Sequence, residues 1–162
     1  TQSRSSAASD VYKRQASRPS VGSLFFAASK RKYIVTISTK TTDYLDPILL
    51  ENLGYNAQIG VLGHEVAHIA QYLNMGFGKT IHLVGIEVFS KKKVDTFERN
   101  TDIRSINHGL GYQLLAWSTE VREALKIDRL SIDKSAKPIV ERERYLDPEA
   151  ITARIKKSAM YN

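Results

Sequence analysis

Apolar residues recur every three or four positions along most of this chain, which is the spacing of an amphipathic helix. Two earlier runs, "SVGSLFFAAS" and "RKYIVTIST", are instead rich in strand-forming residues and predict a hairpin or two neighbouring strands within 22–39. The predicted helices are a short one after Asp46-Pro47, a long one over 56–74, one over 80–89 with strand as the alternative, and three more over 94–110, 112–125 and 149–160. We therefore expect an α+β fold, mostly helical, with a small sheet or hairpin near the N-terminus.

A single domain accounts for most of the 162 residues, and a chain of this length buries a real core without disulfides. Residues 1–15 differ from the rest because they are poor in apolar side chains and read like translated cloning sequence. They also lack the continuous apolar stretch of a signal peptide or membrane helix. We predict that 1–15 is a non-native or disordered leader and that 16–162 is the domain, which leaves the cellular compartment open.

Composition excludes several kinds of site. The chain contains no cysteine, so any metal site must use His, Asp and Glu side chains, and no thiol nucleophile exists. The net charge is +7, and removing the leader leaves 21 basic against 16 acidic residues, or +5. Short basic runs such as 30–32 and 91–93 are typical of solvated loops, and no nucleic-acid motif accompanies them. We expect no nucleic-acid partner and no transmembrane segment.

The long helix over 56–74 carries the sequence His64-Glu65-Val-Ala-His68. At about 100° per residue, the two histidines lie one turn apart on one face, where both imidazoles reach the same ion. Glu65 lies to the side of that face, the position of a general base that holds a water molecule. The motif therefore indicates a Zn²⁺ site with His64 and His68 as ligands and Glu65 as the catalytic base.

The context of the motif supports this hypothesis over a pair of packed histidines. Glu65 is the only charged residue among the 27 residues from 52 to 78, so the helix is expected to be covered on most sides. An uncompensated carboxylate is costly there, and a nearby cation would compensate it. The projection predicts a core stripe opposite the histidines, formed by Ile59, Leu62, Val66, Ile69 and Leu73.

A catalytic zinc site usually needs a third protein ligand. The metzincin pattern is excluded, because Gln71 and Asn74 occupy the positions of its glycine and its third histidine. In the next helix, Glu98 and Asp102 are four residues apart and project away from the polar stripe, so both are expected to point inward. We predict Glu98 as the third ligand and Asp102 as the partner of the outer nitrogen of a liganding imidazole.

Alternatives for these residues remain. Asp102 or a histidine is the second choice for the third ligand, and Asp95-x-x-Glu98 has the spacing of a capping box, in which Glu98 only bonds the start of its helix. His82 and His108 are expected at the surface or in hydrogen bonds. His108 and Tyr112 are candidates for stabilising an oxyanion, although their spacing does not require that role.

The pair formed by HEVAH at 64–68 and Glu98-Arg-Asn-Thr-Asp102 resembles the gluzincin metallopeptidases with a Glu-x-x-x-Asp second motif. These include the HtpX-like and CAAX-protease-like peptidases and their small soluble relatives, the minigluzincins. The resemblance covers roughly residues 30–125 and implies a zincin-like domain with a central HExxH helix. Two departures are the missing membrane helices and Thr101, where the membrane-bound members tend to have alanine.

The resemblance implies a zinc-dependent peptidase (a hydrolase) acting on a peptide or protein, with zinc on His64, His68 and Glu98, Glu65 as base and Asp102 orienting a histidine. It also implies an edge strand that pairs with extended substrate, for which the candidate is Tyr33, Ile34, Val35, Thr36, Ile37 and Ser38. The alternative is a catalytically inactive binding or regulatory module with a structural zinc. Substrate, cleavage mode and oligomeric state cannot be read from the sequence.

Overall fold

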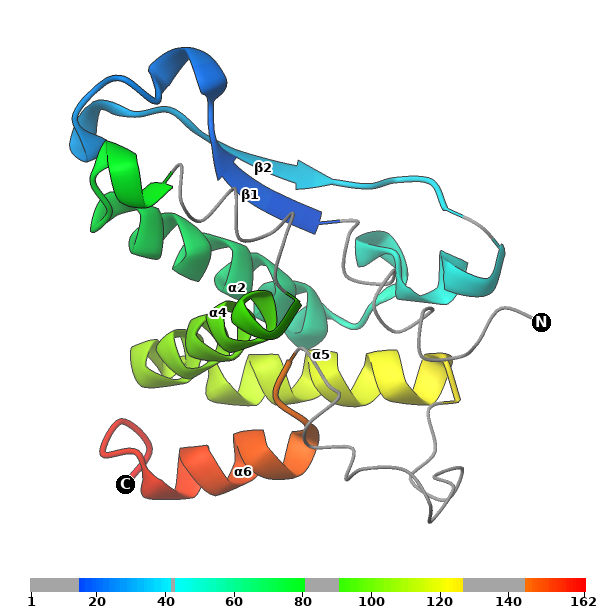
Figure 1. Cartoon of the computed structure of the whole chain (residues 1–162). Helices are drawn as coiled ribbons and strands as arrows, with labels where there is room; N and C mark the ends of the chain where they lie inside the picture. The colour runs from blue at the N-terminus through cyan, green and yellow to red at the C-terminus, as the bar shows by residue number, and fades with distance from the viewer. Residues whose placement is uncertain (1–14, 42, 81–90, 127–144) are drawn as a thin grey trace.

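The computed structural model describes residues 15–41, 43–80, 91–126 and 145–162. Its strands and α-helices are β1 (Gln15–Pro19), β2 (Tyr33–Ile37), α2 (Tyr55–Leu73), α4 (Lys91–Ser105), α5 (Gly111–Ala124) and α6 (Pro148–Lys157) (Figure 1). Short 3₁₀ turns occupy η2 (Val21–Ser23), η3 (Ala28–Lys30), η4 (Asp43–Ile48) and η5 (Leu50–Asn52), and a π-helical turn forms η6 (Ile106–Leu110). The predicted mostly helical α+β class is confirmed. Within these ranges, no helix is both long and apolar enough to cross a membrane.

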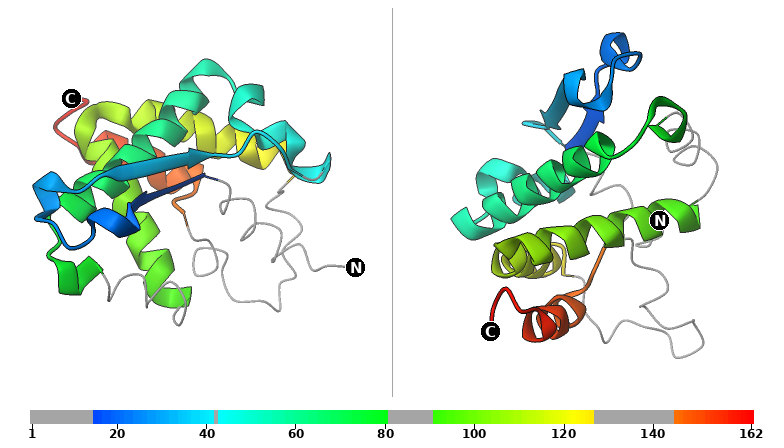
Figure 2. Two further views of the ribbon diagram at one scale, coloured as in Figure 1. Left: turned by 90° about the horizontal axis from the view of Figure 1, so that it is seen from above. Right: turned by 90° about the vertical axis from the view of Figure 1, so that its left-hand side faces the viewer.

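The elements form layers around α2. The sheet lies on one side of α2, whereas α4 and α5 lie on its other side and α6 covers α5 (Figures 1 and 2). The apolar core is buried between α2, α5, α6 and the turns before α2, and its members are Leu45, Ile48, Leu53, Ala57, Val61, Ile106, Leu114, Trp117, Val121, Leu125, Ile151 and Ile155. The face of α2 that points away from the sheet therefore packs against the other helices.

The sheet has two antiparallel strands, and its first strand is not the one predicted. β1 pairs with β2 in a register that sets Gln15 opposite Ile37 and Pro19 opposite Tyr33. The prediction of a strand in "SVGSLFFAAS" is wrong, because that segment forms η2 and η3. The Ser23 hydroxyl donates to the Ser20 carbonyl (2.9 Å) and accepts from the Lys32 amide (3.0 Å), local bonds that compete with strand pairing. Gln15, assigned to the leader, begins β1.

The segment after Asp46-Pro47 forms 3₁₀ turns rather than the short helix predicted there. Pro47 lies inside η4 and has no N–H to donate, and η4 is followed directly by η5, so no α-helical ladder develops. Leu45 and Ile48 still reach the core. Apart from Thr80, the helix predicted over 80–89 lies outside the described residues.

The long helix α2 has the predicted extent, but the face that it buries is the one opposite to the predicted face. The predicted core stripe is wrong: Leu62, Val66 and Leu73 are 39%, 59% and 45% exposed. The histidine face is the buried one, because α4 supplies partners for its polar groups and α5 packs beside it. Apolar periodicity alone could not show this, since it identifies a face of a helix but not the element that covers the other face.

Small residues let α5 approach α2 closely. A Cβ atom at Gly60 would collide with the backbone carbonyl of Gln113 on α5. The Glu120 carboxylate, also on α5, accepts a hydrogen bond of 2.7 Å from the amide of Gly54 at the start of α2. Backbone and side chain thus fix the position of the motif helix against α5.

Helices α4 and α5 are joined by the turn η6, which interrupts the helix predicted over 94–110. His108 and Gly109 leave helical geometry there, and Gly109 adopts φ 89°, a conformation that favours glycine. The Tyr161 hydroxyl spans the interruption, since it donates to the Ile106 carbonyl (2.9 Å) and accepts from the Gly111 amide (2.5 Å). The chain therefore changes direction between α4 and α5 without losing its backbone partners.

Helix α6 begins where the sequence predicted. Asp147 is its N-cap and accepts a hydrogen bond of 2.7 Å from the Ala150 amide, while Pro148 occupies the first turn. Ile151 and Ile155 point into the core. This packing holds the residues just before α6 next to α4, where they contribute to the site described below.

Candidate metal centre

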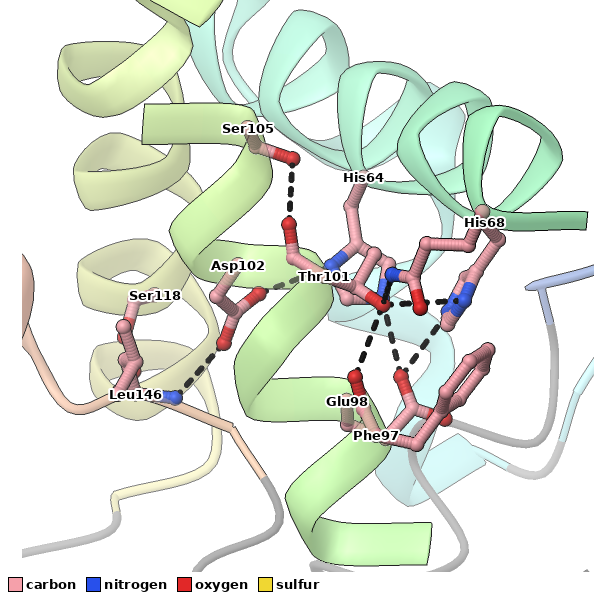
Figure 3. Close-up of polar contacts among 10 residues, drawn as sticks. His64, His68, Phe97, Glu98, Thr101, Asp102, Ser105, Ser118 and Leu146 are labelled. Carbon is pink, nitrogen blue, oxygen red and sulfur yellow. Dashed lines mark hydrogen bonds and ion pairs between the residues drawn. The ribbon is translucent and has the colours of Figure 1, made fainter. Parts of the chain in front are cut away.

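The two motif histidines point from α2 toward a carboxylate on α4 (Figure 3). The Nε2 atoms of His64 and His68 lie 3.1 Å and 3.0 Å from the same oxygen, Oε2 of Glu98. His64 is only 2% exposed, and the Glu98 side chain is 13% exposed. Residues that are 30 and more positions apart therefore meet in one cluster between α2 and α4.

The three side chains can serve one ion. One ligand atom from each of His64, His68 and Glu98 lies within 4.8 Å of the others. Two imidazole nitrogens and one carboxylate oxygen are a donor set that zinc takes in catalytic sites, where a fourth position stays open for water or substrate. The geometry fits a single cation between α2 and α4.

Asp102 extends the cluster on the side of His64. Its Oδ1 lies 2.8 Å from Nδ1 of His64, and its Oδ2 accepts a hydrogen bond of 2.8 Å from the backbone amide of Leu146 (Figure 3). The carboxylate is 1% exposed and has partners for both oxygens. Asp102 thus orients the His64 ring and at the same time ties the segment before α6 to the cluster.

Thr101 takes the corresponding place beside His68. Its hydroxyl oxygen lies 3.2 Å from Nδ1 of His68 and 3.0 Å from the Phe97 carbonyl, and it accepts a hydrogen bond from the Gln71 side-chain amide. Thr101 and Gln71 are both buried. Each histidine therefore has one ring nitrogen directed at Glu98 and the other at a partner supplied by α4.

Burial and charge act in opposite directions on these groups. Burial lowers the pKa of His64, but its hydrogen bonds to Asp102 and Glu98 outweigh this and raise the pKa from 6.5 to about 10. Burial raises the pKa of Glu98, and hydrogen bonds from His64 and His68 reverse this and hold the pKa well below its ordinary value. In the metal-free cluster, His64 is a cation held between two carboxylates.

Glu65, which follows His64 in the sequence, is buried. Within the described ranges its Oε2 has no hydrogen-bond partner. A buried carboxylate oxygen without a partner is costly and calls for an explanation. A cation held by His64, His68 and Glu98, together with a water molecule bonded to the free oxygen, would supply one. The residues present therefore fit a metal, and the unpartnered oxygen is the observation that tests the fit.

Aromatic rings enclose the histidines. The His64 ring centre lies 5.5 Å from that of Trp117 and 5.4 Å from that of Tyr145, and His68 stacks on Phe97 at 5.1 Å. Apolar walls of this kind exclude water and lower the local dielectric, which strengthens every charge interaction inside the cluster. The ring of Trp117 belongs to the core, so the cluster is continuous with it.

The alternatives to Glu98 as the third ligand lie away from the shared centre or outside the described residues. Asp95 lies inside α4, which begins at Lys91, so it cannot form a capping box with Glu98. Asp102 faces the Nδ1 side of His64 rather than the shared centre. His108 is exposed in η6, and His82 lies outside the described residues.

The remaining site candidates lie apart from the cluster. Tyr112 is exposed, and its ring packs edge-on against Tyr161 at 5.4 Å. Among the described residues, neither Tyr112 nor His108 forms a hydrogen bond with the three ligands. Of the proposed substrate strand, residues 33–37 form β2 and Ser38 follows it. β1 packs against α2 along its length, and β2 contacts α2 through the ring of Tyr33, which stacks on Tyr72 at 6.4 Å.

Sequence reasoning missed three contributors to the cluster. Thr101 and Gln71 hold the His68 ring, and the Leu146 amide binds Asp102. A signal for the first two existed: Thr101 is three residues after Glu98, and Gln71 is three residues after His68, so each shares a helix face with a ligand. No signal pointed to Leu146, because a backbone amide acts through its position alone.

Comparisons of the chain with models of protein families, with curated proteins and with solved structures return no match. The function of the cluster must therefore be argued from its own geometry.

Proposed function

We propose that this chain is a zinc-dependent peptidase domain of the gluzincin type, with a zincin-like fold. In this proposal His64, His68 and Glu98 hold the metal, Glu65 is the general base and Asp102 orients His64. The observation that carries the proposal is the meeting of one oxygen of Glu98 with the Nε2 atoms of both motif histidines, at 3.0 and 3.1 Å. The substrate would be a peptide or protein.

The chemistry divides between the ion and the chain. A bound zinc ion supplies Lewis acidity, which polarises a peptide carbonyl and lowers the pKa of a water molecule. Glu65 would take a proton from the attacking water and return it to the leaving amine, a role that fits its Oε2, which has no hydrogen-bond partner among the described residues. Asp102 accepts from Nδ1 of His64 and so keeps Nε2 of that ring free for the metal.

A second candidate is an inactive module in which the metal is structural. The burial of the cluster favours it, since His64 is 2% exposed and structural zinc sites are closed. A structural site, however, has no use for a buried Glu65 with a free carboxylate oxygen, because four ligands complete its shell. The two candidates therefore differ in the role of Glu65.

The test compares wild type with Glu65→Gln and Glu98→Ala in two assays, zinc content by elemental analysis and cleavage of a fluorogenic peptide library. We expect zinc in wild type and in Glu65→Gln, and a sharp loss of zinc in Glu98→Ala. Cleavage should fall about 10²-fold or more in Glu65→Gln, as expected for loss of a general base.

Each other result has a definite meaning. Equal cleavage by wild type and Glu65→Gln would overturn the role of Glu65 as the base, whereas zinc-bound wild type that cleaves nothing would favour the structural module. Zinc retained by Glu98→Ala would move the third ligand elsewhere. Folded wild type without zinc would end both candidates and leave the cluster as a buried ion-pair network.

A further inference from the structure

We propose that Thr101 is a positioning residue for the metal: its hydroxyl, held by Gln71 and the Phe97 carbonyl, acts as a hydrogen-bond acceptor that keeps the His68 proton on Nδ1 and leaves Nε2 free to bind. This inference rests on the proposed metal site but not on peptide cleavage.

The partners of the Thr101 hydroxyl use its full bonding capacity. A hydroxyl donates one hydrogen and accepts two. The Phe97 carbonyl, 3.0 Å away, can only accept, so it takes the hydrogen of Thr101. The Gln71 amide nitrogen can only donate, so it occupies one acceptor site of the oxygen. One acceptor site remains, and the atom that faces it is Nδ1 of His68 at 3.2 Å.

This arrangement selects one form of the His68 ring. A neutral imidazole carries its proton on one nitrogen, and the other nitrogen binds a metal. Because Thr101 has no hydrogen left to donate, Nδ1 must be the protonated nitrogen. When a metal binds, Nε2 is then the nitrogen that offers its lone pair; in the metal-free cluster the same nitrogen lies 3.0 Å from Oε2 of Glu98 and donates to it.

The Nδ1 proton of each histidine is thus held by a different kind of acceptor. Asp102, an obligate acceptor when ionised, holds the proton of His64 on Nδ1. For His68 the acceptor is a neutral hydroxyl, which could equally donate if it were free to rotate. The Gln71 side-chain nitrogen and the Phe97 carbonyl prevent this, since that nitrogen only donates to the hydroxyl and the carbonyl only accepts from it. Burial of Thr101 and Gln71 keeps water from replacing either partner.

The test uses three threonine variants and zinc affinity measured by competition with a chelator. Thr101→Val keeps the side-chain shape but removes the hydroxyl, and we expect zinc affinity to fall about 10- to 100-fold, as for loss of other partners of metal ligands. Thr101→Ser keeps the hydroxyl and should stay within a few-fold of wild type.

Thr96→Val is the matched control. Thr96 lies on the same helix, and its exposed hydroxyl donates to the Lys92 carbonyl at 3.0 Å, the same four-residue bond that Thr101 makes to Phe97. Its replacement reports the general cost of losing such a bond in α4. We expect no change in zinc affinity for this variant.

A spectroscopic measurement on wild type covers the case in which Thr101→Val does not fold. Long-range ¹H–¹⁵N correlation spectra of the zinc-loaded protein should show the His68 ring protonated on Nδ1 and ligated through Nε2. Ligation through Nδ1, or unchanged zinc affinity in folded Thr101→Val, would overturn the inference while leaving the metal site intact. Wild type that binds no zinc would instead overturn the proposed function.

Discussion

At the scale of single residues, the state of the cluster depends on which ring nitrogens carry a proton. His64 lies between Glu98 and Asp102, within 3.1 Å of one and 2.8 Å of the other, and is buried with both. Without a metal, charge balance favours a proton on each ring nitrogen of His64. With a metal on Nε2, one of those protons must leave. Proton and metal therefore compete for the same place.

The raised pKa of His64 predicts how the stability of the metal-free protein depends on pH. The pKa of His64 is raised from 6.5 to about 10 on folding, so the stabilisation by its charge is complete below about pH 6.5 and is lost as the pH rises toward 10. The free energy of unfolding, measured with urea in the presence of a chelator, should fall over this range.

Asp102→Asn is the control for that measurement. It weakens the interactions that raise the pKa of His64, so its unfolding free energy should depend less on pH between 6.5 and 10 than that of wild type. At the acidic end, the lowered pKa of Glu98 predicts loss of stability as the pH falls below its ordinary 4.5. Parallel curves for the two proteins between 6.5 and 10 would assign the alkaline loss to other groups.

At the scale of elements, the sequence predicted which segments are helices better than which way they face. α2 and α5 lie within one residue of their predicted limits, and α6 begins within one residue of its predicted start but ends three residues early; period and end signals are local properties. The buried face of α2 was predicted wrongly, because the carboxylates that justify burying His64 and His68 come from a different helix. The first strand was missed since its partner lies 14 and more residues away and its own residues are ordinary.

The site followed the opposite pattern. The motif helix and the inward carboxylates of α4 predicted the three converging side chains without any tertiary information. The supports around them depend on packing and were not predicted, as the Leu146 amide shows. Sequence thus pointed to the groups that converge, whereas the groups that hold them in place became visible only in the fold.

The crossing of α2 and α5 allows a direct test of packing. Gly60→Ala places a methyl group against the backbone carbonyl of Gln113, which cannot move away without shifting α5. We expect a net loss of about 1–3 kcal/mol in unfolding free energy, the typical cost of overpacking, despite the gain in helix propensity. Urea denaturation of the two proteins measures it.

Gly63→Ala is the matched control on the same helix. Its methyl group meets the end of the flexible Leu110 side chain rather than backbone, so the neighbour can adjust. The loss should be smaller than for Gly60→Ala, or absent. Equal losses in both variants would show that the α2–α5 distance adjusts freely and that the close approach is not a constraint.

At the scale of the whole molecule, the cluster joins parts of the chain that lie far apart in the sequence. His64 and His68 come from α2, Glu98 and Asp102 from α4, and the Leu146 amide from the segment that leads into α6. A bound ion would therefore link α2 to α4 directly and α6 through Asp102. Metal binding and global stability are expected to be coupled.

The coupling predicts that zinc raises the melting temperature. A ligand present at 100 times its dissociation constant stabilises the folded state by about 2.7 kcal/mol, if it does not bind the unfolded chain. Differential scanning calorimetry should show this rise in wild type, its reversal by a chelator, and its absence in Glu98→Ala. A folded wild type whose melting temperature ignores zinc would contradict the coupling.

The position of Trp117 allows its fluorescence to report on the site. It is the only tryptophan in the chain, and its ring lies 5.5 Å from that of His64. A protonated imidazole quenches the emission of a nearby indole, because it accepts charge from the excited ring, and a metal on His64 takes the place of one of its protons. The brightness of the unlabelled protein should therefore report, in real time, whether His64 carries a proton or an ion.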